Sequence, residues 1–71
     1  MKITYDPNVN AAYIRLREGK FQVTTQRLTE DIAINYDPHG SVVGIEILDA
    51  SKYLFKHKQP QIELENLQIA S

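Results

Sequence analysis

The chain has 71 residues, enough for one small domain. Its 8 basic and 9 acidic residues give a formal net charge of −1, without the basic excess of a dedicated nucleic-acid-binding domain. It has no cysteine, which excludes disulfides and thiolate metal sites, and His39 and His57 lie too far apart in sequence for a helical metal pair. No apolar run approaches the about 20 residues of a membrane span. We therefore expect a cytoplasmic protein without metal or cofactor.

The length of the chain also bears on its stability. Domains of this size bury only about 60% of the surface of their unfolded chain, so they commonly depend on disulfides, a metal or a partner. With the first two excluded, we expect a homo-oligomer or a complex with another protein.

An internal repeat organises much of the chain. The segment Ile3-Thr4-Tyr5-Asp6-Pro7 is echoed by Ile34-Asn35-Tyr36-Asp37-Pro38, and each copy reads as a strand, an Asp-Pro turn and a second strand. Aspartate can accept hydrogen bonds from the backbone N–H groups that follow it, and proline presets φ for a turn. We therefore interpret both aspartates as turn caps rather than as paired catalytic or metal-binding carboxylates.

Period-2 alternation of apolar and polar residues predicts the other strands. One face of each of three strands carries Ala12, Ile14 and Leu16, then Ile32, Ile34 and Tyr36, then Val43, Ile45 and Ile47. The segment 21–28 is expected to add an edge strand, with its turn at 29–31. Gly44, inside a predicted strand, indicates a bulge or the close approach of a neighbour.

After Leu48 the pattern changes to that of a helix. Asp49 or Ser51 is the expected N-cap, and Pro60 ends the helix after about two turns. The predicted fold is α+β: a small antiparallel sheet of four or five strands, built from two repeated β-hairpins, with a short helix after the last hairpin. We assign residues 1–58 to a single β-rich domain and residues 59–71 to a C-terminal tail.

The tail contains four large aliphatic residues, more than a disordered end normally carries. We expect it to pack on the domain or on a partner chain. The candidate partner-binding residues are Ile62, Leu64, Leu67 and Ile69.

No constellation of a nucleophile, base and orienting group can be assembled from these residues, so we expect no catalytic residues and no enzyme activity. Tyr13, Arg15 and Arg17 alternate onto one strand face, where aromatic and basic side chains could bind nucleic acid. The simpler interpretation is a solvated face, with Arg15 paired across strands to Glu46.

Several segments together resemble the short bacterial proteins of the family called domain of unknown function 2283. The resemblance covers roughly residues 1–52 and is carried by Ile3-Thr4-Tyr5-Asp6-Pro7, Ala11-Ala12-Tyr13-Ile14-Arg15-Leu16, Ile34-Asn35-Tyr36-Asp37 and Val42-Val43-Gly44-Ile45-Glu46-Ile47-Leu48-Asp49-Ala50-Ser51.

The resemblance implies no assigned activity and no catalytic residues. Some members resemble the antitoxin half of a toxin–antitoxin pair, beside a small ribonuclease-like toxin. We therefore expect a protein–protein interaction module. Its partner is expected to be a second copy of the chain or a small toxin-like protein, and in the second case the chain would be the antitoxin-like half of the pair. The alternatives are a nucleic-acid-binding module and a self-associating protein without catalytic activity. Self-association could exchange the two hairpins between two chains.

Overall fold

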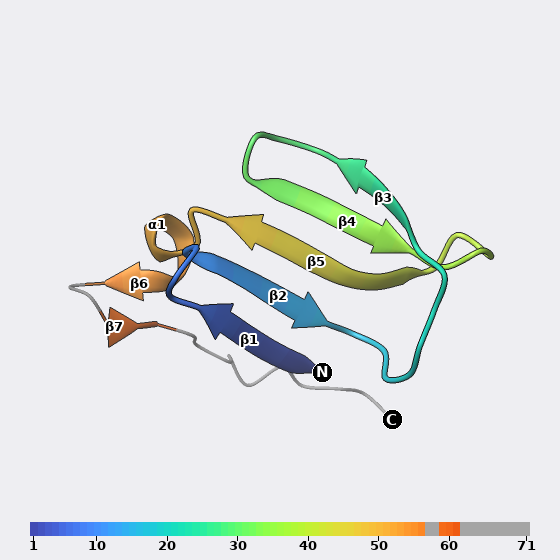
Figure 1. The fold of residues 1–71 in the computed structure, drawn as a ribbon, viewed down its shortest axis with the longest axis horizontal. Helices are drawn as coiled ribbons and strands as arrows, with labels where there is room; N and C mark the ends of the chain where they lie inside the picture. Colours follow the sequence, from blue (N-terminus) through green and yellow to red (C-terminus); the bar gives the residue numbers. More distant parts are fainter. Residues whose placement is uncertain (57–58, 62–71) are drawn as a thin grey trace, which may run out of the picture.

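The computed structural model describes residues 1–56 and 59–61 of the chain. Its main feature is a five-stranded sheet in which every pair of neighbouring strands is antiparallel. The strands are β1 (Lys2–Asp6), β2 (Ala11–Arg15), β3 (Thr24–Arg27), β4 (Ile32–Tyr36) and β5 (Val42–Leu48). Their order is β1-β2-β5-β4-β3, so β5 is central and β1 and β3 are the edges (Figure 1).

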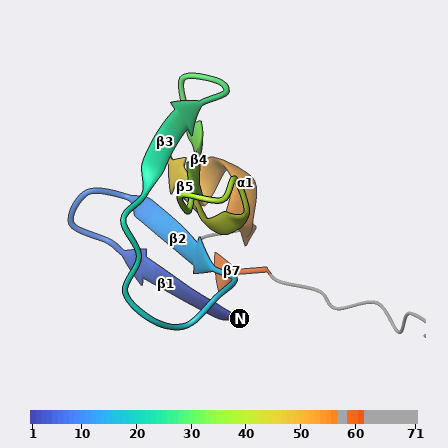
Figure 2. The same cartoon turned by 90° about the vertical axis from the view of Figure 1, so that its right-hand side faces the viewer.

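A short helix and a small ribbon follow the sheet. Helix α1 (Ser51–Leu54) is a single turn, and β6 (Phe55–Lys56) pairs with β7 (Gln59–Pro60). Figure 2 shows α1 on one side of the sheet, which we call the inner face; the opposite side is the outer face. The structure is thus mostly β, with an antiparallel sheet and a short terminal helix, as the sequence predicts.

The start and length of the helix differ from the prediction. The N-cap is Ala50 rather than Asp49 or Ser51, and this residue makes no side-chain capping hydrogen bond. Asp49 has a left-handed φ of 51°, and the N–H of Ser51 donates to the side chain of Asn10 instead. The helix ends at Phe55, which has extended φ and ψ, so the chain returns to strand after one turn rather than two.

The main buried cluster lies on the inner face and is small, and Ala33 and Val43 are buried as well. Ala12, Ile47 and Ala50 are buried on the inner face, because α1 packs across β2 and β5. The partly buried residues around them are Ile14, Ile32, Ile45 and Leu54. Because most of these buried side chains are small, they remove little apolar surface from water and stabilise the fold only modestly.

The register sets a row of isoleucines across the inner face. Ile3 lies opposite Ile14, Ile14 opposite Ile45, and Ile45 opposite Ile34, so the row crosses four strands. All four side chains are only partly buried. Within the described residues, no helix is long and apolar enough to cross a membrane.

Candidate interaction surfaces

The outer face carries a ladder of polar side chains across the sheet. The hydroxyl of Thr25 on β3 donates to Asn35 Oδ1 at 2.6 Å, and Asn35 Nδ2 on β4 donates to the hydroxyl of Tyr13 on β2 at 3.1 Å. The Tyr13 ring reaches Asn35 by lying across Gly44 of β5, where a Cβ atom would overlap the ring and its hydroxyl. Gly44 therefore leaves the space that joins β2 to β4 on this face.

Gly44 also adjoins an irregularity in the sheet. The register between β4 and β5 shifts between Asn35 and Tyr36, which lie opposite Gly44 and Val42. Both readings of this glycine from the sequence, a bulge and a close approach, are confirmed.

The two turn aspartates act as caps, as predicted. Asp6 Oδ1 accepts the N–H of Asn8 at 2.9 Å, and Asp37 Oδ1 accepts the N–H groups of His39 and Ser41, each at 2.9 Å. Asp37 is buried and also pairs with the guanidinium of Arg17. The Ser41 N–H and then the Arg17 guanidinium hold the pKa of Asp37 below its ordinary value of 3.8.

The structure separates the three residues considered for nucleic-acid binding. Tyr13 and Arg15 share the outer face, where the guanidinium carbon of Arg15 lies 5.8 Å from the centre of the Tyr13 ring. Arg17 instead pairs with Asp37 and lies 4.7 Å over the ring of Phe21. Arg17 is therefore engaged by Asp37 and Phe21, whereas Tyr13 and Arg15 contact each other.

The predicted ion pair between Arg15 and Glu46 is wrong. In the register of β2 with β5, Arg15 lies opposite Gly44 and Glu46 lies opposite Tyr13. The ion pairs found among the described residues are those of Arg17 with Asp37 and Lys52 with Asp31.

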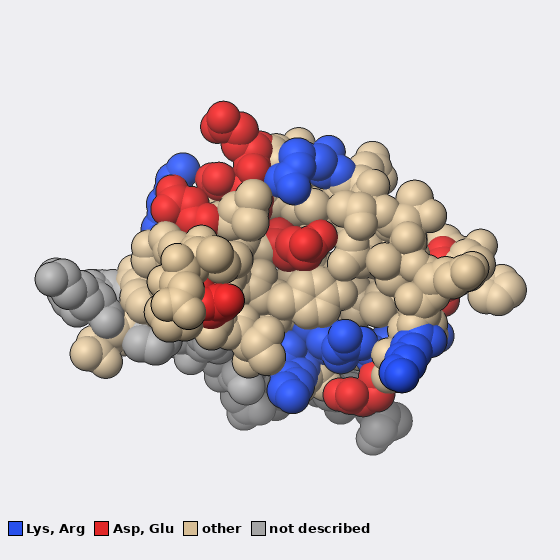
Figure 3. All heavy atoms as spheres, viewed as in Figure 1, with Lys and Arg blue, Asp and Glu red and all other residues tan. Residues whose placement is uncertain are grey.

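Charge is unevenly distributed over the outer face. This is the face turned to the viewer in Figure 3, because α1 lies behind the sheet in that view. Basic side chains gather at its lower middle and right, over the end of β2 and the loop that follows, and acidic side chains lie at its centre and upper left. Basic side chains are therefore denser over the end of β2, although an acidic group lies beside them at the lower right and a further basic group lies at the top of the view.

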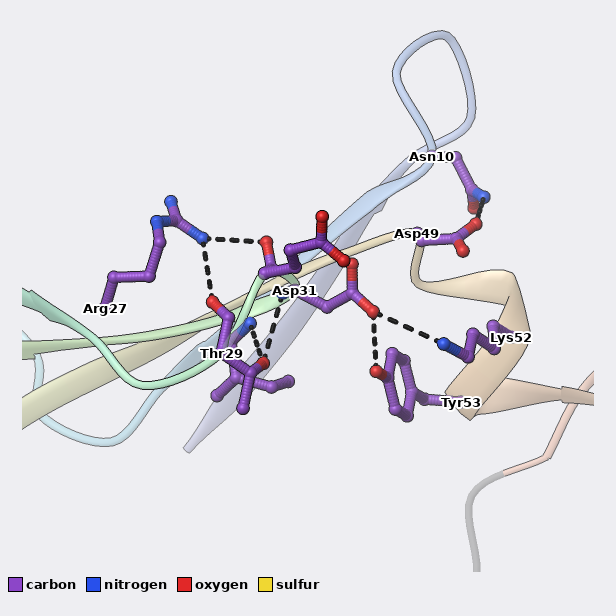
Figure 4. A network of polar contacts seen from close by, with 9 residues as sticks. Asn10, Arg27, Thr29, Asp31, Asp49, Lys52 and Tyr53 are labelled. Carbon is purple, nitrogen blue, oxygen red and sulfur yellow. Dashed lines mark hydrogen bonds and ion pairs between the residues drawn. The ribbon is translucent and has the colours of Figure 1, made fainter.

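A polar network ties α1 to the turn between β3 and β4 (Figure 4). The hydroxyl of Tyr53 donates to Asp31 Oδ2 at 2.6 Å, and Lys52 Nζ lies 3.5 Å from the same oxygen. The Tyr53 hydrogen bond is the main cause that lowers the pKa of Asp31, and the same bond raises the pKa of Tyr53. This network holds the helix over the β4 end of the inner face.

Asn10 makes a second connection to the helix. It lies just before β2 with a left-handed φ of 53°, and its Oδ1 accepts the N–H of Ser51 at 3.0 Å. Its Nδ2 donates to Ser51 Oγ at 2.9 Å and to Asp49 Oδ1 at 3.2 Å, and its carbonyl accepts the N–H of Ala50 at 2.9 Å. One residue of the first turn therefore positions the start of α1.

Strand β3 is an exposed edge. All four of its residues, Thr24–Arg27, are exposed, and among the described residues it pairs only with β4. The N–H of Leu28 donates to the carbonyl of Ile32. Because inward and outward groups alternate along an antiparallel strand, the N–H groups of Gln26 and Thr24 also face β4, and those of Thr25 and Arg27 face away from the sheet.

Two large aliphatic side chains flank this edge. Val23 is 47% exposed and Leu28 is 52% exposed. An edge strand with outward backbone groups and apolar flanks is a template on which another chain can add a strand. The sequence predicted the edge strand, but composition alone did not mark it as the candidate contact.

The candidate partner-binding residues of the tail, Ile62, Leu64, Leu67 and Ile69, lie outside the described residues, as does His57. Sequence reasoning missed the role of Asn10, since its partners lie about 40 positions further along the chain. Its position directly after the first Asp-Pro turn is the one local signal that could have marked it.

Comparison with protein families gives one match. The profile described as "Protein of unknown function (DUF2283)" matches residues 2–51, which include all five strands of the main sheet. The chain belongs to this family. The DUF2283 match ends at the first residue of α1 and leaves β6 and β7 outside it. No curated protein and no solved structure matches the chain.

Proposed function

We propose that this protein is a protein–protein interaction module that binds a partner chain along β3. The observation that carries the proposal is the exposed edge, in which the outward N–H groups of Thr25 and Arg27 lie between the exposed side chains of Val23 and Leu28. Main-chain hydrogen bonds to an added strand supply affinity, and flanking side chains supply specificity.

The thin core supports the same proposal. The buried residues of the inner-face core are two alanines and Ile47, and the isoleucine row beside them is only partly buried. A strand added at β3 would extend the sheet beyond Gln26, which pairs with Ile34, and would bury apolar surface of the flanking Val23 and Leu28.

Arg27 offers a matched pair of variants for the test. Arg27→Pro removes an N–H that faces away from β4, so it leaves the ladder to β4 intact and blocks an added strand. Arg27→Ala removes the side chain, whose Nη1 donates to the carbonyl of Glu30 at 3.0 Å, but keeps the N–H. The chain and both variants are tagged, and the proteins that they capture from the native lysate are quantified by mass spectrometry.

We expect the wild type and Arg27→Ala to capture one partner protein in an amount equal to that of the tagged chain. Arg27→Pro should no longer capture it. Equal capture by all three would show that the partner binds elsewhere. Deletion of residues 62–71 tests the separate proposal that the aliphatic residues of the tail contact the partner. Growth arrest by the captured protein, when it is expressed alone, would identify the chain as antitoxin-like.

Self-association is the second form of the same proposal. The two-fold pairing of one β3 with the β3 of another copy would use the same outward groups. Capture of the untagged chain alone, lost in Arg27→Pro, identifies this form. The nucleic-acid alternative has less support, because Arg17 is engaged by Asp37 and the Tyr13 ring lies against Gly44.

A further inference from the structure

The outer face contains a hollow of about 500 Å³ at the basic end of the sheet. It lies between the end of β2, the loop that follows it, and β4. Its lining includes Tyr13, Arg15, Lys20, Phe21, Val23 and Asn35.

The charge of this hollow is of one sign. Arg15 and Lys20 are its charged lining residues, and no carboxylate lines it. A second hollow of about 300 Å³, on the other side of Tyr13, has the opposite character, since its charged lining residues are Asp6 and Glu46. Tyr13 therefore separates a cationic hollow from an anionic one on the same face.

Two donors of the cationic hollow, Arg15 and the Tyr13 hydroxyl, are held in place by hydrogen bonds. Arg15 Nη1 donates to the carbonyl of Gly19 at 3.0 Å, which orients the guanidinium and leaves its other N–H groups for a ligand. The Tyr13 hydroxyl accepts from Asn35 Nδ2, so its own hydrogen can be donated. Asn35 is 8% exposed and is itself fixed by Thr25, so this part of the wall is built before any ligand binds.

The hollow also has an apolar side. Phe21 is partly buried, with Arg17 over its ring, and Val23 is 47% exposed. Two cations and a hydroxyl donor match the charge of a phosphate monoester, about −1.5 to −2 at neutral pH, better than that of a single carboxylate. The apolar wall suits a small hydrophobic body attached to that phosphate.

We propose that this hollow binds a small phosphate monoester, with the phosphate at Arg15, Lys20 and the Tyr13 hydroxyl and the body of the ligand against Phe21 and Val23. The phosphate end of this site lies on β2 and the loop after it, whereas its apolar end adjoins the β3 edge, because Val23 lines the hollow and also flanks that edge. The titration below uses the free chain, so its outcome does not depend on partner binding. The site uses Tyr13 and Arg15 from the pair on the outer face, and Lys20 in place of Arg17.

The test is a titration of the full chain with phenyl phosphate, followed by NMR chemical shifts and by calorimetry. We expect saturable shifts at Tyr13, Lys20 and Phe21, and weaker binding of inorganic phosphate, which lacks the apolar body. Lys20→Gln should weaken binding about tenfold, because a hydrogen bond to a charged group is lost. Lys52→Gln removes the same charge beside α1 and should leave binding unchanged.

Three results would overturn the proposal. The first is the absence of saturable shifts at the residues that line the hollow. The second is an equal loss of affinity in Lys20→Gln and Lys52→Gln, which would indicate unspecific attraction of an anion. The third is tighter binding of a single-stranded oligonucleotide, which carries phosphate diesters, than of phenyl phosphate, which would assign the hollow to nucleic acid.

Discussion

Gly44 is the residue on which the outer face depends most directly. Its missing side chain leaves room for the Tyr13 ring, and the Tyr13 hydroxyl in turn accepts a hydrogen bond from the buried Asn35. A single Cβ at this position therefore affects three strands at once, because Tyr13, Gly44 and Asn35 lie on β2, β5 and β4.

Gly44→Ala should destabilise the protein by about 1–3 kcal/mol, as overpacking does in tightly packed sites. The cause is specific, so the cost should shrink in a Tyr13→Ala background, where the ring is gone. Urea unfolding of the two single variants and the double variant measures this coupling. An equal cost of Gly44→Ala with and without the Tyr13 ring would contradict the packing described above.

Asp37 should make the stability of the fold depend on pH at the acid end. Its pKa is lower in the folded chain than the ordinary value of 3.8, so the unfolded chain binds the proton more readily. The stabilisation is present above that value and is lost as the pH falls through the lower, folded-state pKa. Asp31, whose pKa is also lowered, adds to the same trend.

Urea midpoints between about pH 5 and pH 2 check this expectation. The midpoint should fall steadily as the pH drops, and Asp37→Asn should be less stable at neutral pH but show a shallower fall. Parallel curves for the wild type and Asp37→Asn would show that the carboxylate does not carry this dependence.

At the scale of elements, α1 is too short to be stable on its own and depends on its contacts. Asn10 contacts its start through four hydrogen bonds, and Asp31 contacts it through Tyr53 and Lys52. The helix is therefore positioned by two turns of the sheet rather than by its own capping residues.

Two substitutions at Asn10 separate the side chain from the backbone. Asn10→Gly keeps the left-handed φ and loses the side-chain hydrogen bonds to Asp49 and Ser51, so it should cost about 1–2 kcal/mol. Asn10→Ala should cost about 1–2 kcal/mol more, because a residue with a Cβ resists that φ. Urea unfolding measures both, and equal costs for the two variants would show that φ at this position carries no strain.

Local patterns predicted most of the elements. The Asp-Pro turns and the alternation between residues 32 and 47 depend only on neighbouring residues, and they placed β4, β5 and their turn correctly. The helix cap could not be predicted in this way, because Asn10 lies 41 positions before Ser51. Tertiary hydrogen bonds decided where that helix starts.

The register between strands could not be predicted from the sequence either. The pairing of Arg15 with Glu46 assumed that equal positions of the two repeat copies face each other, but the strand order sets Arg15 opposite Gly44. The cationic hollow combines residues from β2, β4, β5 and the loop after β2, so it follows from that order. That the two hairpins are repeated copies of one unit remains a prediction from the sequence.

Taken together, the described residues form a five-stranded sheet and a two-stranded ribbon, with a small buried cluster on the inner face and outward backbone groups at the β3 edge. In the proposed function, a partner chain binds along this edge. The groups that would bind the added strand are the backbone N–H groups of Thr25 and Arg27. A measurement on these N–H groups therefore tests the proposal without changing any side chain.

The most direct measurement is amide hydrogen exchange at β3, in the dilute free chain and in the complex that the capture experiment yields. We predict fast exchange of the Thr25 and Arg27 amides in the free chain, slower exchange of the Gln26 and Leu28 amides, which face β4, and protection of Thr25 and Arg27 in the complex. Unchanged exchange of Thr25 and Arg27 on binding, or protection in the dilute free chain, would contradict the account.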